Sequence, residues 1–191
     1  MNSFDQFNLK KHLKNAVNDL GFTSPTPIQE KTFSTILSGK DLVGIAQTGT
    51  GKTLAYLLPI LEEMKYSKEL NPRVLILVPT RELVQQVVDQ AEDLAKCMNV
   101  RVVGVYGGAN IKTQAAELSH GVDIIVATPG RLYDLALARA FQVKTIKKLV
   151  IDEVDVMLDL GFRPQLTNIM EIIPEKRQNI MFSATMTDHV D

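Results

Sequence analysis

The sequence predicts an α/β fold in which a mostly parallel sheet is covered by helices on both faces. Short runs of β-branched residues alternate with longer segments in which apolar residues recur at helical spacing. The strand-like runs are almost continuously apolar, which is typical of strands buried on both faces of a parallel sheet. The chain has 191 residues, enough for one domain with a substantial core.

Six runs are predicted to be strands, and the segments between them supply the helices. In chain order the strands are expected at 42–45, 74–78, 100–105, 122–126, 149–151 and 180–182. Apolar stripes predict helices over 9–20, before the first strand, and over 83–95. Another helix should follow the first strand from residue 54, with a kink at Pro59, which lacks the N–H group that a helix uses.

The composition limits the classes of partner and compartment. The formal net charge is −1, so any polyanion must be held by a local site and not by general basicity. Cys97 is the only cysteine, which excludes an intrachain disulfide and suits a reducing compartment. It ends a helical pattern and is expected to be buried. With no signal-peptide pattern and no apolar run near the ~20 residues of a membrane span, we expect a cytoplasmic monomer without membrane contact.

The loop after the first predicted strand has the pattern of a phosphate-binding loop. It follows G-x-x-x-x-G-K-[ST], except that Ala46 replaces the first glycine. Backbone N–H groups at a helix N-terminus point at anionic oxygens, so the loop is predicted to hold the phosphates of a nucleotide. Lys52 would reach the terminal phosphates, and the Thr53 hydroxyl would ligate Mg²⁺. The residues predicted to bind the cofactor here are Ala46, Gln47, Thr48, Gly49, Thr50, Gly51, Lys52 and Thr53.

A glycine-rich turn between a strand and a helix is the alternative interpretation of this loop. That interpretation accounts for Gly49 and Gly51. It does not account for Lys52 and Thr53 directly after them, so the nucleotide-binding interpretation is favoured.

An apolar strand that ends at residue 151 is followed by carboxylates, as a nucleotide site requires. Asp152 can hold Mg²⁺, largely through water. Glu153 can orient and deprotonate an attacking water. Asp155 could accept a hydrogen bond from Ser183 or Thr185. The alternative is a solvated acidic turn, which the phosphate loop upstream makes less attractive.

The segment 21–29 precedes the phosphate loop and is stiffened by two prolines. The Gln29 side chain offers a donor and an acceptor, which can pair with the N6/N7 edge of adenine. Phe22 could stack on the base. The alternative is a helix-entry loop in which Thr26 caps the next helix and Gln29 is merely exposed. Taken alone, the segment favours this alternative.

Further strand ends carry short hydroxyls, glycines and arginines, which are groups that contact phosphates and sugars. Singly, each cluster is better explained as a helix cap beside a solvated charge. Together they indicate a track for a sugar-phosphate backbone. The predicted contacts with that backbone are Pro79, Thr80, Arg81, Gly107, Gly108, Thr128, Pro129, Gly130 and Arg131.

Taken together and in order, these segments resemble the DEAD-box family of ATP-dependent RNA helicases, from Phe4 to Thr185. The chain looks like the first of the family's two RecA-like domains, a three-layer α/β sandwich. Segment 4–29 matches the isolated aromatic residue and the Q motif. The loop 46–53 matches motif I, including its initial alanine. The remaining matches are motif Ia at 79–83, the glycine doublet at 107–108, motif Ib at 128–131, motif II at 152–155 and motif III at 183–185.

The resemblance implies a role for each matched residue. ATP and Mg²⁺ are the expected cofactors, with Lys52, Thr53, Asp152 and Glu153 at the phosphates, the metal and the attacking water. Ser183 and Thr185, with Asp155, would couple the state of the nucleotide to RNA binding. The residues implied on the adenine side are Phe4, Phe22, Thr26 and Gln29.

Two departures from the family pattern carry consequences. Val154 stands where the family has alanine, and its extra volume could shift the neighbouring motif. The sequence ends at Asp191, six residues after Thr185. We therefore expect residues 1–191 to be an N-terminal domain whose second RecA-like partner lies in cis outside this chain.

The expected function is that of an ATP-binding domain in an RNA helicase, which hydrolyses ATP to ADP and phosphate and locally unwinds RNA duplexes or remodels RNA–protein complexes. By itself the domain should bind nucleotide weakly and turn over little. One alternative is a phosphate-loop enzyme acting on small molecules, which would leave the segments 21–29 and 128–131 unused. The other is a non-catalytic, nucleotide-dependent binding module, against which the intact Glu153 argues.

Overall fold

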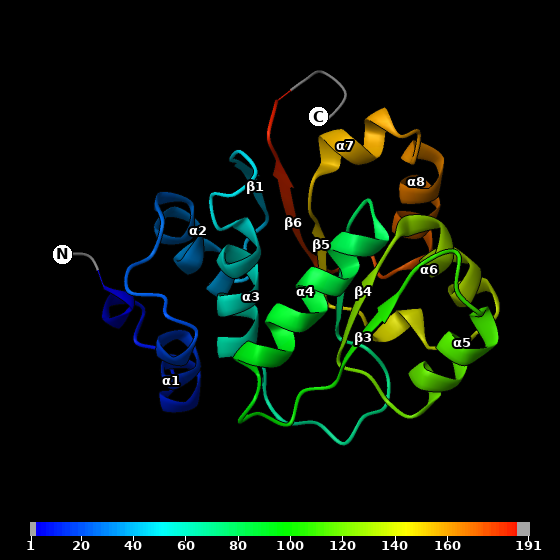
Figure 1. Cartoon of the computed structure of the whole chain (residues 1–191). Coiled ribbons are helices and arrows are strands. Elements are labelled where there is room, and N and C mark those ends of the chain that lie inside the picture. The colour runs from blue at the N-terminus through cyan, green and yellow to red at the C-terminus, as the bar shows by residue number, and fades with distance from the viewer. Residues whose placement is uncertain (1–2, 187–191) are drawn as a thin grey trace.

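The computed structural model describes residues 3–186 as a six-stranded sheet between two layers of helices (Figure 1). All pairings between its strands are parallel, and the order across the sheet is β1-β6-β5-β2-β4-β3. The strands are β1 (Leu42–Ile45), β2 (Val74–Leu77), β3 (Val102–Val105), β4 (Ile124–Ala127), β5 (Lys148–Ile151) and β6 (Gln178–Ser183). The predicted RecA-like α/β sandwich is thereby confirmed.

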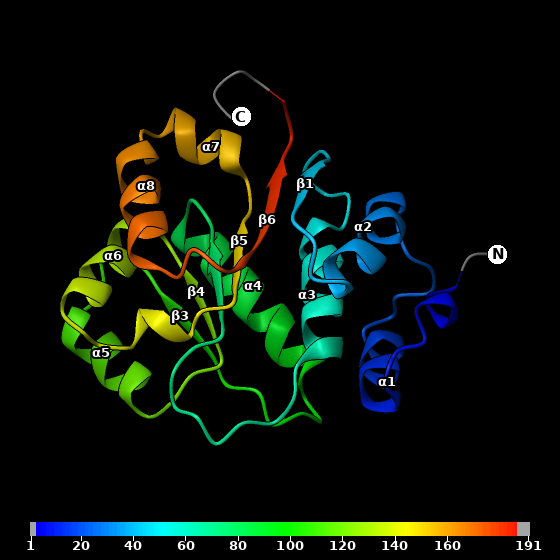
Figure 2. The same cartoon turned by 180° about the vertical axis from the view of Figure 1, so that it is seen from behind.

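Eight α-helices and two short 3-10 helices are described alongside the sheet in residues 3–186. The helices are α1 (Lys11–Asp19), α2 (Pro27–Leu37), α3 (Lys52–Glu63), α4 (Arg81–Leu94), α5 (Ile111–Ser119), α6 (Pro129–Leu137), α7 (Val154–Asp159) and α8 (Arg163–Ile172), with η1 (Phe4–Phe7) and η2 (Val143–Thr145). Seen from both sides, α1 to α4 and α5 to α8 lie in separate halves of the molecule (Figure 1, Figure 2). None of the helices within residues 3–186 is long and apolar enough to cross a membrane.

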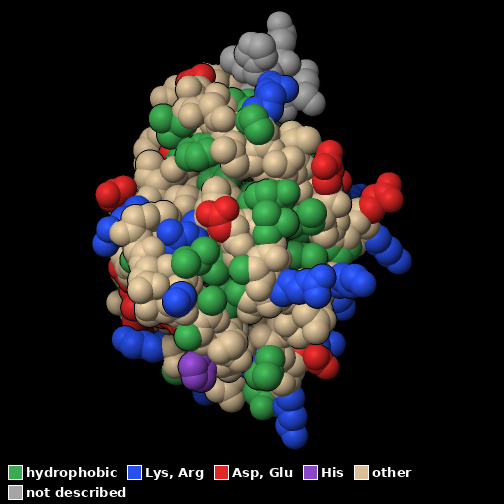
Figure 3. Space-filling model, turned by 90° about the vertical axis from the view of Figure 1, so that its right-hand side faces the viewer, with side chains coloured by type: hydrophobic (Ala, Val, Ile, Leu, Met, Phe, Trp, Pro, Cys, Tyr) green, Lys and Arg blue, Asp and Glu red, His purple; other side chains and the backbone are tan. Residues whose placement is uncertain are grey.

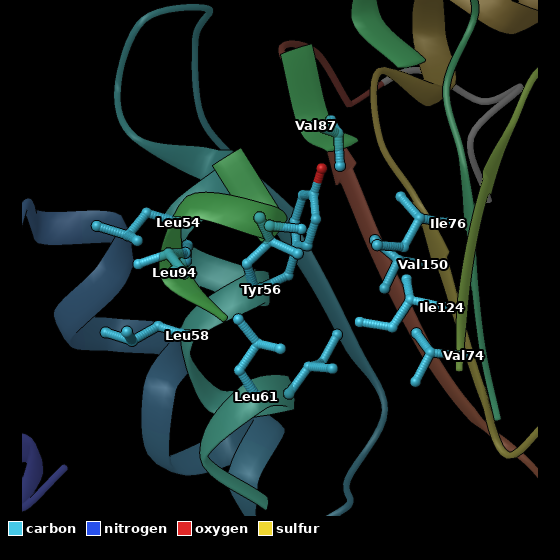
Figure 4. Close-up of a cluster of buried hydrophobic side chains, with 14 of the residues drawn as sticks. Leu54, Tyr56, Leu58, Leu61, Val74, Ile76, Val87, Leu94, Ile124 and Val150 are labelled. Carbon is cyan, nitrogen blue, oxygen red and sulfur yellow. The ribbon is translucent and has the colours of Figure 1, made fainter. Parts of the chain in front are cut away.

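Two hydrophobic cores form because successive strand residues point to opposite faces of the sheet. In β2, Val74 and Ile76 belong to the core beneath α1 to α4, whereas Leu75 and Leu77 belong to the core beneath α5 to α8. Figure 4 shows the first core, in which side chains of α3 face those of β2, β4 and β5. Burial on both faces explains why these strands are apolar without interruption.

Several predicted boundaries shift by one or two residues, and one prediction is wrong. The run 122–126 becomes strand only from Ile124, because the Val122 amide bonds Leu70 O and the Asp123 amide bonds Arg101 O in the loop before it. Pro59 lies inside the continuous helix α3. Cys97 was expected to be buried but is exposed, since α4 ends at Leu94 and Cys97 lies in the following turn, off the apolar stripe.

A buried charge cluster holds the amino-terminal edge of the sheet together. The Asp123 carboxylate, 1% exposed, accepts hydrogen bonds from the main chain and guanidinium of Arg101 and from Arg73. Burial alone would raise the pKa of Asp123, but the bonds from Arg101 and Arg73 lower it below its ordinary value. Arg101 also donates to the carbonyl oxygen of Glu69. The cluster therefore joins β4 to the loops before β2 and β3.

One face of the molecule carries side chains of mixed charge. On the face turned toward the viewer in Figure 3, lysine and arginine side chains are interspersed with acidic ones and with hydrophobic patches. No single-signed field spreads over this face, as expected from a formal net charge of −1. Any recognition of a polyanion must accordingly rest on local groups.

Candidate nucleotide site and nucleic-acid track

The loops that follow the strands meet at one edge of the sheet, because all six described strands run parallel. The sheet order divides this edge into two halves. Strands β1, β6 and β5 lead into the predicted nucleotide residues, and β2, β4 and β3 lead into the predicted RNA contacts. The two halves adjoin where β5 pairs with β2. A nucleotide and an RNA strand could therefore lie side by side on this edge.

The phosphate loop between β1 and α3 is already folded as a turn. Gly49 and Gly51 have φ of 82° and 84°, a left-handed conformation that favours glycine. The Thr50 hydroxyl donates to the carbonyl oxygen of Gln47 at 2.6 Å. Gly51 is the N-cap of α3, so the unpaired N–H groups of the first helical turn lie at this loop. The arrangement suits a bound anion.

Lys52 is the first residue of α3 and is only 6% exposed. Its Nζ has no hydrogen-bond partner among residues 3–186, and the nearest described carboxylate oxygen, Oδ1 of Asp152, is 4.0 Å away. A buried ammonium without hydrogen bonds is costly. The residues present therefore fit a nucleotide whose phosphates would satisfy Lys52.

Asp152 follows β5 and is also 6% exposed. Burial and the neighbouring charge of Glu153 raise its pKa to about 6, although the charge of Lys52 opposes the rise. Its Oδ1 accepts the amide N–H of Glu153 at 2.9 Å. The Asp152 carboxylate is suited to hold a cation, because oxygen ligands are those that Mg²⁺ prefers.

Glu153 has an unusual backbone conformation that the sequence did not reveal. Its φ of 56° and ψ of 49° lie in the left-handed region, which costs a non-glycine residue roughly 1 kcal/mol. Strain of this kind tends to occur at functional sites. The conformation makes Glu153 the N-cap of α7 and turns the chain sharply between β5 and that helix. The following Val154 is 5% exposed and packs in the second core, where its extra methyl groups are accommodated.

Ser183 at the end of β6 and Thr185 just after it contact the phosphate loop and Asp155 of α7. The main-chain oxygen of Ser183 accepts the amide of Ala46 at 3.0 Å, which ties β6 to the start of the phosphate loop. The Ser183 hydroxyl donates to the carbonyl oxygen of Thr185 at 2.7 Å. Of the two donors considered for Asp155, the structure uses Thr185, whose hydroxyl lies 3.3 Å from Oδ2.

Gln29 is not the exposed residue of the alternative interpretation: it is 4% exposed and spans two segments. Its Oε1 accepts the amide of Thr26 at 2.9 Å, and its Nε2 donates to the carbonyl oxygen of Gly51 at 3.1 Å. Thr26 is the N-cap of α2, as that interpretation expected. Gln29 thus braces the phosphate loop, and its contact with adenine stays a prediction.

The two aromatic residues proposed beside the base are used in packing. Phe4 is 5% exposed and its ring meets that of Phe7 edge-on, with centroids 5.9 Å apart. Phe22 is half-buried and packs against the first core. The structure therefore presents Phe4 as part of the core, and stacking of either ring on a base stays a prediction.

Sequence reasoning missed Tyr56, which is fully buried one helical turn after Lys52 and Thr53. Its ring packs against Phe182 of β6, with centroids 5.8 Å apart. Burial raises the pKa of Tyr56 well above its ordinary value, and the charge of Asp152 adds to the rise. The spacing of three to four residues from the lysine and threonine could have revealed it, because such positions share a helical face.

The second half of the edge holds the predicted RNA contacts. Thr80 caps α4, and its hydroxyl accepts the amide of Leu83 at 3.2 Å. The guanidinium of Arg81 lies 4.8 Å from the centre of the Tyr106 ring. Gly107 and Gly108 form the turn after β3. Thr128 and Pro129 begin α6 after β4, followed by Gly130 and Arg131.

The sequence is compatible with Arg131 as a solvated charge or as a phosphate contact. In the structure Arg131 also has hydrogen-bond partners within the domain. Its Nη1 donates to the carbonyl oxygen of Ala109 and to Oε1 of Gln114, both at 2.9 Å. Gln114, which sequence reasoning missed, is 6% exposed. Contact of Arg131 with RNA through its remaining N–H groups stays a prediction.

A parallel α/β sheet with a phosphate loop and an acidic strand end defines a nucleotide-binding domain. The family model described as DEAD/DEAH box helicase matches residues 26–191, and the chain belongs to that family. It is 43% identical to the Pre-mRNA-processing ATP-dependent RNA helicase prp-5 of Neurospora crassa, over 98% of the chain and 16% of that protein. It is 44% identical to the Probable ATP-dependent RNA helicase DDX17 of Homo sapiens, over 98% of the chain and 26% of that protein.

A bacterial relative has a similar level of identity. The ATP-dependent RNA helicase CshA of Listeria monocytogenes is 43% identical over 100% of the chain and 36% of that protein. The chain thus spans from about a sixth to about a third of the length of these relatives. The family model covers the phosphate loop, the acidic strand end and the predicted RNA contacts, and begins after Phe4 and Phe22.

Proposed function

We propose that this chain is the ATP-binding domain of an ATP-dependent RNA helicase, with ATP and Mg²⁺ on the loop 46–53. The observation that carries the proposal is the buried ammonium of Lys52, which lacks a hydrogen-bond partner in the described residues and lies 4.0 Å from Asp152. The phosphates of ATP would supply the missing partner and would also meet the N–H groups at the start of α3.

The residues around the loop divide the remaining tasks. Thr53 would hold Mg²⁺ through its hydroxyl and Asp152 would hold it largely through water. The metal, when bound, would offset the negative charge on the phosphates. Glu153 would orient the attacking water and accept its proton, so that ATP and water give ADP and phosphate.

The half of this edge that follows β2, β4 and β3 is proposed to hold the sugar-phosphate backbone of single-stranded RNA, with little sequence specificity. The relatives are named as RNA helicases. We propose that the full-length protein couples ATP hydrolysis to local duplex separation or to remodelling of RNA–protein complexes, as a cytoplasmic monomer, with a second RecA-like domain in cis. An arginine supplied by that domain would be worth orders of magnitude in phosphoryl transfer. Residues 1–191 alone should therefore bind nucleotide weakly and turn over little.

A nucleotide titration tests the first half of the proposal. A fluorescent ATP analogue is titrated into the chain and into Lys52→Met, with Lys96→Met as the control for an exposed lysine outside the loop. We expect Lys52→Met to weaken binding roughly tenfold or more, because it removes a charge-assisted contact, and Lys96→Met to leave it unchanged. Equal affinity in all three forms would contradict the assignment of the loop.

An RNA titration tests the second half and separates the helicase from a phosphate-loop enzyme of small molecules. Oligouridylate is added at several salt concentrations, and binding is followed by NMR, which detects weak complexes. Backbone contacts predict an affinity that falls steeply as salt rises. Strong RNA-stimulated ATP hydrolysis by the isolated chain would contradict the expected need for a second domain.

A further inference from the structure

The loop between β3 and α5 joins two segments of the proposed RNA track that are far apart in sequence. On one side the ring of Tyr106 carries the Arg81 guanidinium, 4.8 Å from its centre. On the other side the Arg131 guanidinium donates to the carbonyl oxygen of Ala109 at 2.9 Å. The loop thus contacts both arginines of the track.

The two ends of the Gln114 side chain bond to this loop and to Arg131. Its Oε1 accepts from Arg131 at 2.9 Å, and its Nε2 donates to the carbonyl oxygen of Tyr106 at 3.1 Å. The side chain is 6% exposed and lies in the first turns of α5. A buried amide with both ends bonded holds its partners in one geometry, because losing either bond would leave a desolvated group unpaired.

We infer that Gln114 and the ring of Tyr106 are positioning residues that fix the distance between Arg81 and Arg131 for the phosphates of a single RNA strand. The inference rests on the proposed RNA function and adds two residues that themselves need not touch RNA. The physical gain is preorganisation: side chains that are already held in place lose less conformational entropy when a ligand binds. Arg81 keeps its charge while resting on the ring, since a cation–π contact leaves its N–H groups open to a phosphate.

The central test compares Gln114→Ala with Gln142→Ala. Gln142 is an exposed glutamine before η2, at the opposite edge of the sheet, and supplies the matched control. Oligouridylate is titrated into residues 1–191 at low salt while the amide signals of Gly107, Gly108 and Thr128 are followed by NMR. We expect Gln114→Ala to weaken RNA binding roughly tenfold, with nucleotide affinity unchanged, and Gln142→Ala to bind RNA like the parent chain.

Tyr106 provides a second variant that does not depend on the buried amide. Tyr106 is half-exposed, so Tyr106→Leu should fold even if Gln114→Ala does not. It should weaken RNA binding several-fold by releasing Arg81. The conservative Tyr106→Phe retains the ring and should regain most of that loss. A merely structural role would lower the melting temperature and would weaken nucleotide and RNA binding together.

Amide hydrogen exchange of residues 107–110 measures how firmly the loop is held in the absence of RNA. Faster exchange in Gln114→Ala, at an unchanged rate in the phosphate loop, is the expected result. RNA binding equal to that of the parent in both Gln114→Ala and Tyr106→Leu would overturn the inference and leave the proposed function intact. Absence of RNA binding by the parent chain itself would overturn the proposed RNA function and this inference with it.

Discussion

The side-chain amide of Gln29 donates to the carbonyl oxygen of Gly51 at 3.1 Å, while its Oε1 accepts the amide of Thr26. The start of α2 is thereby tied to Gly51 of the phosphate loop. Gln29 is the residue proposed to recognise adenine. The same side chain would therefore contact the base and hold the loop that binds the phosphates. Occupation of the two sites is expected to be coupled through it.

Gln29→Ala should weaken both ATP and GTP, and ATP more. The common loss comes from the missing bond to Gly51, about 1 kcal/mol and so about fivefold in affinity. The additional loss for ATP comes from the N6/N7 edge that only adenine presents. Parallel titrations of the two nucleotides measure the ratio. Equal losses would leave Gln29 as a brace of the loop and remove it as the adenine reader.

Gly51→Ala should be more damaging than Gly161→Ala, although the two glycines share a φ of +84°. A Cβ at Gly51 would lie 2.5 Å from Nε2 of Gln29, whereas a Cβ at Gly161 would meet nothing within 4 Å. Both substitutions carry the same backbone strain, about 1 kcal/mol. The difference between their free energies of unfolding, measured by urea denaturation, isolates the clash, and we expect about 1–3 kcal/mol.

A double substitution checks the origin of that difference. In the background of Gln29→Ala, the Cβ of Gly51→Ala no longer meets the side-chain nitrogen. The penalty of Gly51→Ala should then approach that of Gly161→Ala. A penalty that stays as large in the double variant would place the cause in the Thr26 side chain, whose Oγ1 and Cγ2 lie 3.1 and 3.3 Å from that Cβ, or in the backbone of the loop.

Lys52→Met should act in opposite directions on stability and on binding. The test is made without nucleotide at pH 5, where the Asp152 carboxyl, with its pKa of about 6, is largely protonated. There the substitution replaces a buried ammonium that has no hydrogen bond by an apolar side chain of similar length, which should raise the free energy of unfolding by about 1–2 kcal/mol. Thermal melting of the nucleotide-free chain measures this gain. A lower melting temperature would show that the contact with Asp152, 4.0 Å from Nζ, stabilises the fold.

Asp123 should make the fold sensitive to acid. Burial alone would raise its pKa, but the bonds from Arg101 and Arg73 lower it below the ordinary value of 3.8. The stabilisation is therefore fully present above the pKa of the unfolded chain and is lost as the pH falls through the lower pKa of the folded one. Asp123→Asn should destabilise the chain by about 3 kcal/mol near neutral pH, and the difference from the parent should shrink below pH about 3.8.

The control for this prediction is Asp93→Asn, which changes an exposed carboxylate on α4. Urea denaturation of the three forms at a series of pH values gives the required free energies. We expect the Asp93→Asn curve to follow the parent within about 0.5 kcal/mol. A constant difference between parent and Asp123→Asn down to acid pH would contradict the assigned ion pairs.

Much of the candidate site follows from local pattern. An apolar run followed by glycines, Lys52 and Thr53 specifies a strand, a turn and a helix start from neighbouring residues alone. An Asp152 that directly follows a strand has its carboxylate at the carboxyl edge of a parallel sheet, whatever the order of the strands. For this reason the groups at the phosphates and the metal could be predicted without knowledge of their neighbours.

Partnerships between distant segments depended on the tertiary structure. In the sheet β5 lies between β6 and β2, and no local sequence pattern encodes this order. The burial of Gln29 against Gly51, of Gln114 beneath Arg131 and of Phe4 in the core arises from side chains that are brought together only when the helices pack on the sheet. Local sequence thus specified which chemical groups reach the edge, whereas long-range packing decided which of them are paired, because a buried polar group takes its partner from whatever segment the fold places beside it.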